Sequence, residues 1–305
     1  MERWLRNFFL FLSNNRMITR LAKKYGFHLG ASRFVAGKNI EEAVIVIKEL
    51  NKKGLAVTLD FLGEFVESEG EARDRVNQSI KAIEFIRREN LDAQLSVKLT
   101  SMGLDISEDL VLENMRRILR IAKWNDVFVT IDMEDYSRYE KTLNIFKQLR
   151  SESEHIGTVL QAYLYRAEQD LRELHEYEPH FRLVKGAYKE SVEVAYQNKK
   201  DVDDQLKKLI KIHLLSGHYT AVASHDDKII EYTKKVVKEH DIPFEQFEFQ
   251  MLYGIRPECH EKLKDEGYTM RVYVPYGTDW FGYFMRRLAE RPANLQFLLK
   301  GLFKF

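Results

Sequence analysis

The sequence is poor in cysteine and proline, carries no excess of charge of either sign and has no long apolar run. Its single cysteine, Cys259, excludes an internal disulfide framework and any zinc or iron–sulfur site built from several cysteines. Only five prolines and no Gly/Ser-rich tract are present, so nothing marks a linker and we expect residues 1–305 to form one domain. Lys plus Arg number 48 and Asp plus Glu 47, which leaves no basic field for nucleic acid, and we expect no such partner.

Targeting signals are also missing. No stretch approaches the roughly 20 apolar residues that a membrane-spanning helix needs. The early apolar run 8–12 is too short for a secretory signal, and no small-residue cleavage site follows it. Together with the lone cysteine, these absences favour a cytoplasmic protein.

Residues 1–32 are expected to form a helical extension. Its first 30 residues mix aromatic side chains with six basic residues and a single acid, Glu2. This composition is typical of a segment that lies on an anionic membrane surface, which would make the protein peripheral on the inner face of the membrane. An ordinary helix packed on the domain is the alternative.

Motifs for metals and for activated nucleophiles are absent. The nine histidines show no H-E-x-x-H spacing, so we expect no metal site. No G-x-S-x-G elbow occurs, and we interpret Cys259, at an apparent helix start, as inert. His225, just past an apolar run, is either part of a helix cap or a ligand contact.

Short apolar and β-branched runs recur eight times. They span residues 55–61, 94–99, 127–132, 158–163, 181–186, 219–224, 247–252 and 270–274. Between them lie apolar positions with the 3.6-residue period of a helix. Eight strand–helix units predict an α/β fold, a parallel (β/α)8 barrel of the TIM type. The rival, an open doubly wound sheet, lacks its expected G-x-G-x-x-G turn.

One more helix precedes the first predicted strand. Its apolar positions Ile40, Val44, Ile47 and Leu50 share one face. We expect this helix to close the floor of the barrel.

Strand alternation places several polar side chains inside the barrel. Ser96 and Lys98 share one face of their strand, and Asp132, Gln161 and Arg182 face inward from the next three strands. Unpaired buried charges are costly, so these groups should pair with one another or with a ligand. Any one of them could be a structural ion pair. Four on successive strands, toward the end where barrel enzymes carry their chemistry, favour a site for an anionic group.

Two adjacent arginines, Arg286 and Arg287, lie on a helix predicted after the last strand and its Pro-Tyr-Gly-Thr turn. Adjacent helical positions point about 100° apart, so both reach one target only if it lies against the side of the helix. A planar carboxylate or phosphate is such a target, because it matches the guanidinium fork. On this stretch alone, a solvated helix with snorkelling arginines is the simpler interpretation.

Motifs in all eight strands resemble the proline dehydrogenase family. They include LDFLGE (59–64), SVKLTSMG (96–103), IDMED (131–135), RLVKGAY (182–188), ASHD (223–226), FEFQMLYG (247–254) and the stretch 271–294. The resemblance covers residues 33–297 and, at this length, is to the monofunctional form. It implies a distorted barrel that binds FAD and oxidises L-proline to Δ1-pyrroline-5-carboxylate by hydride transfer to flavin N5. It also implies reoxidation by a membrane quinone and use of the product by a separate pyrroline-5-carboxylate dehydrogenase.

The resemblance assigns roles by position. The implied proline site, in which Glu64 forms an ion-pair gate with Arg286, comprises Glu64, Lys98, Asp132, Leu252, Tyr273, Tyr283, Arg286 and Arg287. The implied FAD site comprises Asp132, Gln161, Arg182, Val184, Gly186, Ala187, Tyr188, Lys200, Ser224, His225 and Gln250. Gly186 is expected to allow the backbone close to the flavin. Two alternatives remain, a non-catalytic barrel that binds an amino acid or phosphate and an FMN enzyme acting on other small carboxylates.

Overall fold

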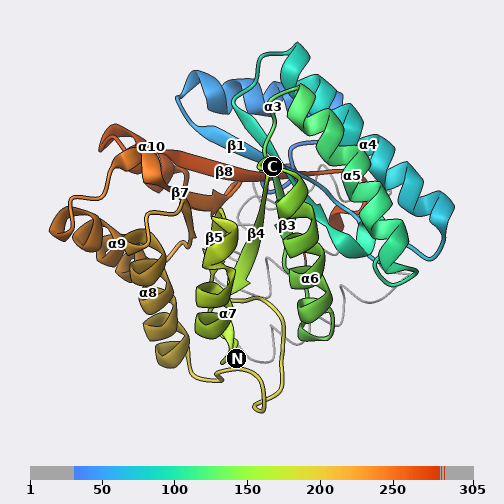
Figure 1. Cartoon of the computed structure of the whole chain (residues 1–305). Coiled ribbons are helices and arrows are strands. Elements are labelled where there is room, and N and C mark those ends of the chain that lie inside the picture. Colours follow the sequence, from blue (N-terminus) through green and yellow to red (C-terminus); the bar gives the residue numbers. More distant parts are fainter. Residues whose placement is uncertain (1–30, 282, 284, 286–305) are drawn as a thin grey trace.

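Eight parallel strands form a closed barrel in the computed structural model, which describes residues 31–281, 283 and 285 (Figure 1). The strands are β1 (Ala56–Phe61), β2 (Ala93–Lys98), β3 (Val129–Asp132), β4 (Ile156–Gln161), β5 (Phe181–Val184), β6 (Thr220–Ala223), β7 (Phe247–Leu252) and β8 (Met270–Tyr276). The barrel closes where β8 pairs with β1, from Ala56 opposite Arg271 to Phe61 opposite Tyr276. The predicted barrel is confirmed, and each strand ends within two residues of its predicted bounds.

Helices surround the barrel, and all those after α3 connect successive strands (Figure 1). They are α3 (Ile40–Lys52), α4 (Glu69–Arg88), α5 (Glu108–Trp124), α6 (Tyr136–Glu152), α7 (Ala167–Glu173), α8 (Lys199–Leu215), α9 (Asp227–Glu239) and α10 (Pro257–Asp265), with short 3-10 turns η2 (Ala31–Arg33), η3 (Leu99–Met102), η4 (Leu174–Tyr177) and η5 (Phe244–Gln246). Polar side chains directly before the first residue cap several of these helices. Ser68 and Ser107, for example, accept backbone N–H groups at the starts of α4 and α5, which fixes where each helix begins.

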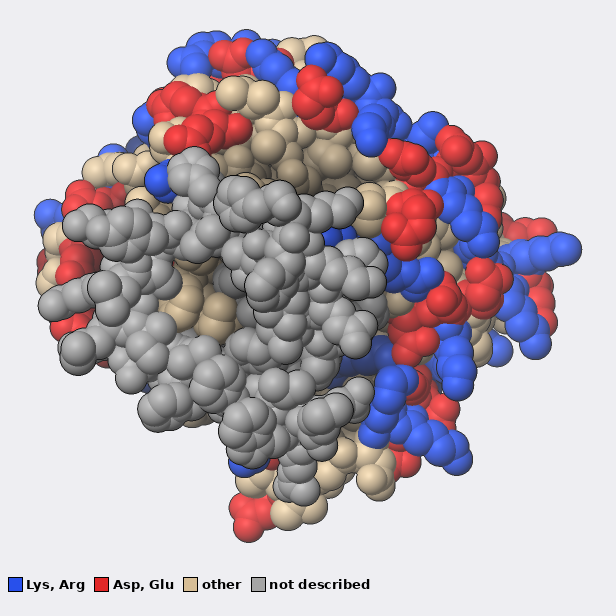
Figure 2. Space-filling view, turned by 180° about the vertical axis from the view of Figure 1, so that it is seen from behind, with Lys and Arg blue, Asp and Glu red and all other residues tan. Residues whose placement is uncertain are grey.

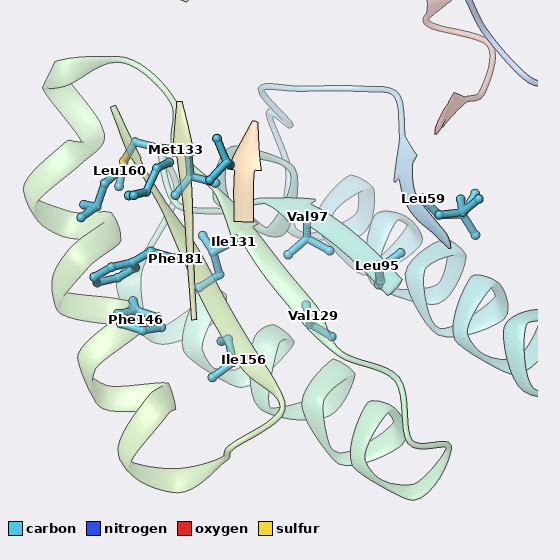
Figure 3. Close-up of a cluster of buried hydrophobic side chains, with 14 of the residues drawn as sticks. Leu59, Leu95, Val97, Val129, Ile131, Met133, Phe146, Ile156, Leu160 and Phe181 are labelled. Atoms are coloured by element: carbon cyan, nitrogen blue, oxygen red, sulfur yellow. The ribbon is translucent and has the colours of Figure 1, made fainter. Parts of the chain in front are cut away.

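The main core lies between the barrel and its helices. Leu59, Leu95, Val129 and Ile131 point outward from neighbouring strands and are fully buried (Figure 3). Phe146 of α6 packs near Phe181 of β5, with ring centroids 6.3 Å apart. Because strand side chains alternate between two faces, these outward apolar positions leave the intervening side chains to fill the barrel.

Helix α3 does not close the barrel floor, contrary to the prediction. It packs outside the barrel against β1, β8 and α4. The chain before it is tied to the end of β8, where Ala36 N donates to Pro275 O at 2.9 Å and Gly277 N donates to Gly37 O at 2.8 Å. Helix α3 therefore starts at the carboxyl end of the barrel and descends its outer face before β1 begins.

Two predictions fall outside the described residues, namely the helical extension apart from η2 and the arginine pair Arg286 and Arg287. Within the described part of the chain, every helix is too short or too polar to cross a membrane. On the face seen in Figure 2, Lys and Arg side chains are interspersed with Asp and Glu, in line with their nearly equal numbers.

Candidate active site

Five strands direct polar side chains into one cluster inside the barrel. Lys98 of β2 binds both carboxylate oxygens of Asp60 at 3.0 Å and one oxygen of Asp132 at 3.2 Å. Arg182 of β5 donates to the other oxygen of Asp132 at 2.6 Å, although β4 lies between their strands. Tyr273, from β8 on the far side of the barrel, donates its hydroxyl to Asp132 at 2.6 Å. The predicted pairing of the interior charges is confirmed, with Asp132 at its centre.

Burial makes these charges depend on one another. Side-chain exposure is 13% for Lys98, 12% for Asp132, 7% for Arg182 and 3% for Asp60. Burial alone would raise the pKa of Asp132, but Lys98 and Arg182 lower it to about 2. Burial would likewise lower the pKa of Lys98, yet Asp60, Tyr273 and Asp132 hold it well above its usual value. Two cations and two carboxylates thus compensate each other within the described part of the site.

A second ion pair lies inside the barrel, nearer the amino ends of the strands than this cluster. Arg271 of β8 donates through Nε to both oxygens of Glu248 at 2.9 Å, and Tyr219 donates its hydroxyl to the same carboxylate at 2.9 Å. Gln250 donates its amide nitrogen to Glu248 at 2.5 Å. Because a carboxylate paired with arginine only accepts hydrogen bonds, it fixes the Gln250 amide with the nitrogen toward Glu248.

Comparison with known proteins assigns the family. A family model described as "Proline dehydrogenase" matches residues 43–300. "Proline dehydrogenase 1" of Bacillus subtilis strain 168 is 59% identical over 300 residues, covering 98% of this chain and 99% of the relative. The "Proline dehydrogenase" of Deinococcus radiodurans is 43% identical and covers 97% of this chain and 96% of the relative. The chain belongs to the proline dehydrogenase family.

Solved structures of longer relatives agree with this assignment. Proline utilization A from Bdellovibrio bacteriovorus, solved after inactivation by N-propargylglycine, superimposes with a TM-score of 0.84 at 28% identity. The match covers 99% of this chain and 38% of that protein. Membership in the proline dehydrogenase family makes the chain an oxidoreductase that acts on the CH–NH group of proline, the first step of proline catabolism.

Proline dehydrogenases are flavin enzymes in general, and buried polar atoms in the barrel suit such a cofactor. Arg182 Nε and Nη2, Gln161 Oε1 and Gln250 Oε1 are buried and have no hydrogen-bond partner among the described residues. Unpaired buried polar atoms are costly, so a ligand that supplies both acceptors and donors would stabilise them. A flavin ring offers carbonyl oxygens and ring nitrogens to arginine and an imide N–H to amide oxygens, so these residues fit the group.

Gly186 has a structural reason in addition to its predicted role beside the flavin. Its φ of +111° lies in a region that side chains rarely adopt, and an added Cβ would come within 2.3 Å of the Tyr163 ring. Tyr163 therefore fills the space on the Cβ side. Val184 ends β5 half-buried, whereas Ala187 is exposed and Tyr188 half-buried in the loop that follows.

The next predicted residues lie in the loop after β6, which holds Ser224 and His225, and on α8, which holds Lys200. His225 accepts the backbone N–H of Leu252 through Nε2 at 3.0 Å, so this ring nitrogen already has a partner. Ser224 accepts the backbone N–H of Asp226 at 3.2 Å. Lys200 is exposed on the first turn of α8, and it is its neighbour Lys199 that forms an ion pair with Asp226 at 3.0 Å.

The described residues that were predicted for the proline site lie toward the carboxyl end of the barrel. Leu252 ends β7 half-buried, Tyr283 is 7% exposed in the helical stretch after β8, and Glu64 follows β1. The charge of Glu64 also contributes, after Asp60 and the other cluster members, to the raised pKa of Lys98. Glu64 is thus close enough to Lys98 to influence the site.

Sequence reasoning missed Asp60, Glu248 and Arg271. The signal was present, because alternation along β1 puts Asp60 on the same face as Thr58, and alternation along β7 puts Glu248 on the same face as Gln250. Glu134, just past β3, was also missed. Its carboxylate accepts hydrogen bonds from both N and Oγ1 of Thr100, and burial raises its pKa to about 7.

Proposed function

We propose that the chain oxidises L-proline to Δ1-pyrroline-5-carboxylate with FAD as the cofactor and a membrane quinone as the final acceptor. Proline would lose a hydride from the ring carbon next to nitrogen and a proton from the nitrogen, so that a C=N bond forms. The flavin, when bound, would supply the hydride acceptor at N5 and pass two electrons to the quinone. The observation that carries the proposal is Arg182, which is held by Asp132 at 2.6 Å and keeps two buried donor nitrogens without a partner among the described residues.

The interior residues would bind and orient the cofactor. Asp132 fixes one Arg182 nitrogen and leaves Nε and Nη2 to donate to the flavin. Gln161 and Gln250 would accept a hydrogen bond through their amide oxygens. Because Glu248 holds the Gln250 amide nitrogen, Gln250 presents an acceptor and suits the imide N–H of the ring. Val184, Gly186, Ala187, Tyr188, Ser224, His225 and, more distantly, Lys200 would line the rest of the FAD site.

The substrate carboxylate would be held by Lys98, Arg286 and Arg287. Asp60 and Asp132 already balance Lys98 and Arg182. The positive charge that an added carboxylate requires would therefore come from the arginine pair. Tyr273 and Tyr283 would wall the proline ring, Leu252 would pack on its methylene groups, and Glu64 would pair with Arg286 over the bound substrate. Closing this gate would exclude water from the reacting atoms.

Anaerobic mixing with L-proline tests the proposal. The FAD-loaded chain should lose the flavin's visible absorption on adding proline, and less with hydroxyproline or pipecolate. Arg287→Met should raise the proline dissociation constant by about tenfold or more while retaining flavin, because it removes a charge-assisted bond to the carboxylate. Arg73→Met, on an exposed arginine of α4, should change neither. An absorption spectrum that proline leaves unchanged would contradict the proposed activity.

The electron acceptor and the location need separate tests. The basic, aromatic residues 1–30 would hold the chain on the inner face of the membrane, where quinone is available. Liposome co-sedimentation should therefore fall when residues 1–30 are removed, and equal pelleting of the two chains would contradict this role.

The relative named "Bifunctional protein PutA" from Escherichia coli is a longer protein, of which this chain covers 24%. We propose that the product of this shorter chain goes to a separate pyrroline-5-carboxylate dehydrogenase.

A further inference from the structure

Arg75 of α4 joins two loops at the carboxyl end of the barrel. Its guanidinium donates to Leu62 O, just after β1, at 3.3 Å and to the carboxylate of Asp279, just after β8, at 3.0 Å. The same group lies over the ring of Phe61, 5.0 Å from its centroid. Arg75 is 23% exposed and Asp279 is 35% exposed, so this ion pair is partly shielded from water.

The backbone at residues 61–63 is closely held by its neighbours. Leu62 N donates to Tyr276 O at 2.8 Å, and the rings of Phe61 and Tyr276 lie 5.2 Å apart. A Cβ added to Gly63 would lie 2.4 Å from the Arg75 guanidinium carbon, and Gly63 has a φ of +147°. Arg75 thus fills the space over Gly63, the residue directly before Glu64.

Asp279 directly precedes the helical stretch that follows β8. Trp280 is the first helical residue after it, and Trp280 and Phe281 are 2% and 5% exposed. Tyr283 follows one turn later and is also buried. The contacts of Arg75 with Asp279 and Leu62 therefore link the start of this stretch to the β1–α4 loop.

We propose that Arg75 is a positioning residue that holds the helical stretch after β8 against the β1–α4 loop and thereby sets the affinity for proline. The inference rests on the proposed function, in which that stretch and Glu64 contribute to the proline site. The cofactor residues come from β3, β4, β5 and β7, from the loops after β5 and β6 and from α8. The hydrogen bonds that Arg75 forms to described residues go instead to Leu62, after β1, and to Asp279, after β8. Loss of Arg75 should hence weaken proline binding while flavin binding and the chemical step change little.

Steady-state proline oxidation by the FAD-loaded full chain tests this inference. Arg75→Met and Asp279→Asn should each raise KM for proline about tenfold, lower kcat less than about threefold and retain flavin. The double variant should resemble the single variants instead of reaching about a hundredfold, because both remove the same contact. Arg75→Lys should lie in between, since an ammonium group lacks the fork that reaches both partners. Arg73→Met is the matched control, because Arg73 lies two residues before Arg75 on α4 and is 62% exposed.

A purely structural role predicts another pattern. It would reduce the active fraction, so that kcat and flavin content fall together while KM stays constant, and that result would overturn the inference. Additive effects of the two single substitutions on log KM would also overturn it. If Arg75→Met fails to fold, Asp279→Asn decides, because its side chain is more exposed.

A second measurement separates this inference from the proposed function. If the unmodified FAD-loaded chain does not oxidise proline, the proposed function fails before any variant is compared. Amide hydrogen exchange of residues 277–285, measured without substrate, still tests the positioning role. Exchange there should be at least about fivefold faster in Arg75→Met than in Arg73→Met, and equal rates would overturn the inference.

Discussion

Replacing Asp132 by asparagine should destabilise the protein strongly, although the change is nearly isosteric. Ser96, Lys98, Arg182 and Tyr273 all donate to its two oxygens. Asparagine would turn one acceptor into an NH2 donor that faces other donors, and it would leave two buried cations with a single remaining carboxylate.

The size of the effect follows from the charge balance. The pKa of Asp132 falls from 3.8 to about 2 in the folded protein, since Lys98 and Arg182 outweigh the opposing effect of burial. At about 1.4 kcal/mol per pH unit, this corresponds to about 2–3 kcal/mol at neutral pH. Breaking a buried ion pair typically costs about 3–5 kcal/mol. We therefore expect Asp132→Asn to lower the free energy of unfolding by about 3 kcal/mol at pH 7.

The sign of the pH dependence is also determined. A carboxyl group with a lowered folded pKa stabilises the protein fully above its unfolded pKa, and this contribution is lost as the pH falls from about 4 to about 2. The difference between the wild type and Asp132→Asn should therefore be constant from pH 7 to pH 5 and shrink below pH 4.

Urea unfolding, followed by circular dichroism at a series of pH values, measures this difference. Asp105→Asn is the matched control, because Asp105 binds Arg138 at 2.7 Å but is 39% exposed. An exposed ion pair should contribute less than about 1 kcal/mol. The reasoning would be refuted if Asp132→Asn cost no more than Asp105→Asn, or if its cost did not change below pH 4.

Two other predictions concern Gly186 and the buried His213. Gly186→Ala should lower the free energy of unfolding by about 3 kcal/mol in urea titrations, because φ is +111° and Cβ would overlap Tyr163. Gly217→Ala, with φ +82° and nothing within 4 Å, should cost only about 1 kcal/mol, and equal costs would contradict the role of Tyr163. His213 is fully buried, and burial lowers its pKa to about 3, so wild-type thermal stability should fall as the pH drops from about 6.5 to 3. His213→Phe should weaken this dependence and exposed His240→Phe should not, while identical pH profiles would refute the idea.

Local rules explain why the inner residues of the barrel were predictable. Lys98, Asp132, Gln161 and Arg182 each follow from alternation within one strand, which depends only on the extended backbone. The contacts between these side chains depend in addition on the tertiary structure. Arg182 reaches Asp132 past β4, and Tyr273 reaches it from β8, so their meeting requires the closed barrel and its register.

Periodicity specifies which face of a helix is apolar, but not what that face packs against. The apolar face of α3 was correctly predicted, as Ile40, Val44 and Ile47 are buried. Its place beside β1 and β8 was not, because it depends on backbone bonds between residues 36–37 and the end of β8. Gly186 is similar. Its identity suggested a special backbone, and only the fold brought Tyr163 into the space beside it.

The sequence by itself determined the eight strand–helix units, the inward position of the charged residues and the family motifs, because these depend on spacing along the chain. Only the tertiary structure decided that Asp60 and Asp132 neutralise Lys98 and Arg182, that Glu248 fixes the Gln250 amide and that Arg75 bridges to Asp279. The ion pairs join residues from different strands, helices or loops, and Glu248, although on the same strand as Gln250, is itself held by Arg271 of β8. Their distances are set by closing the barrel, which no local pattern encodes.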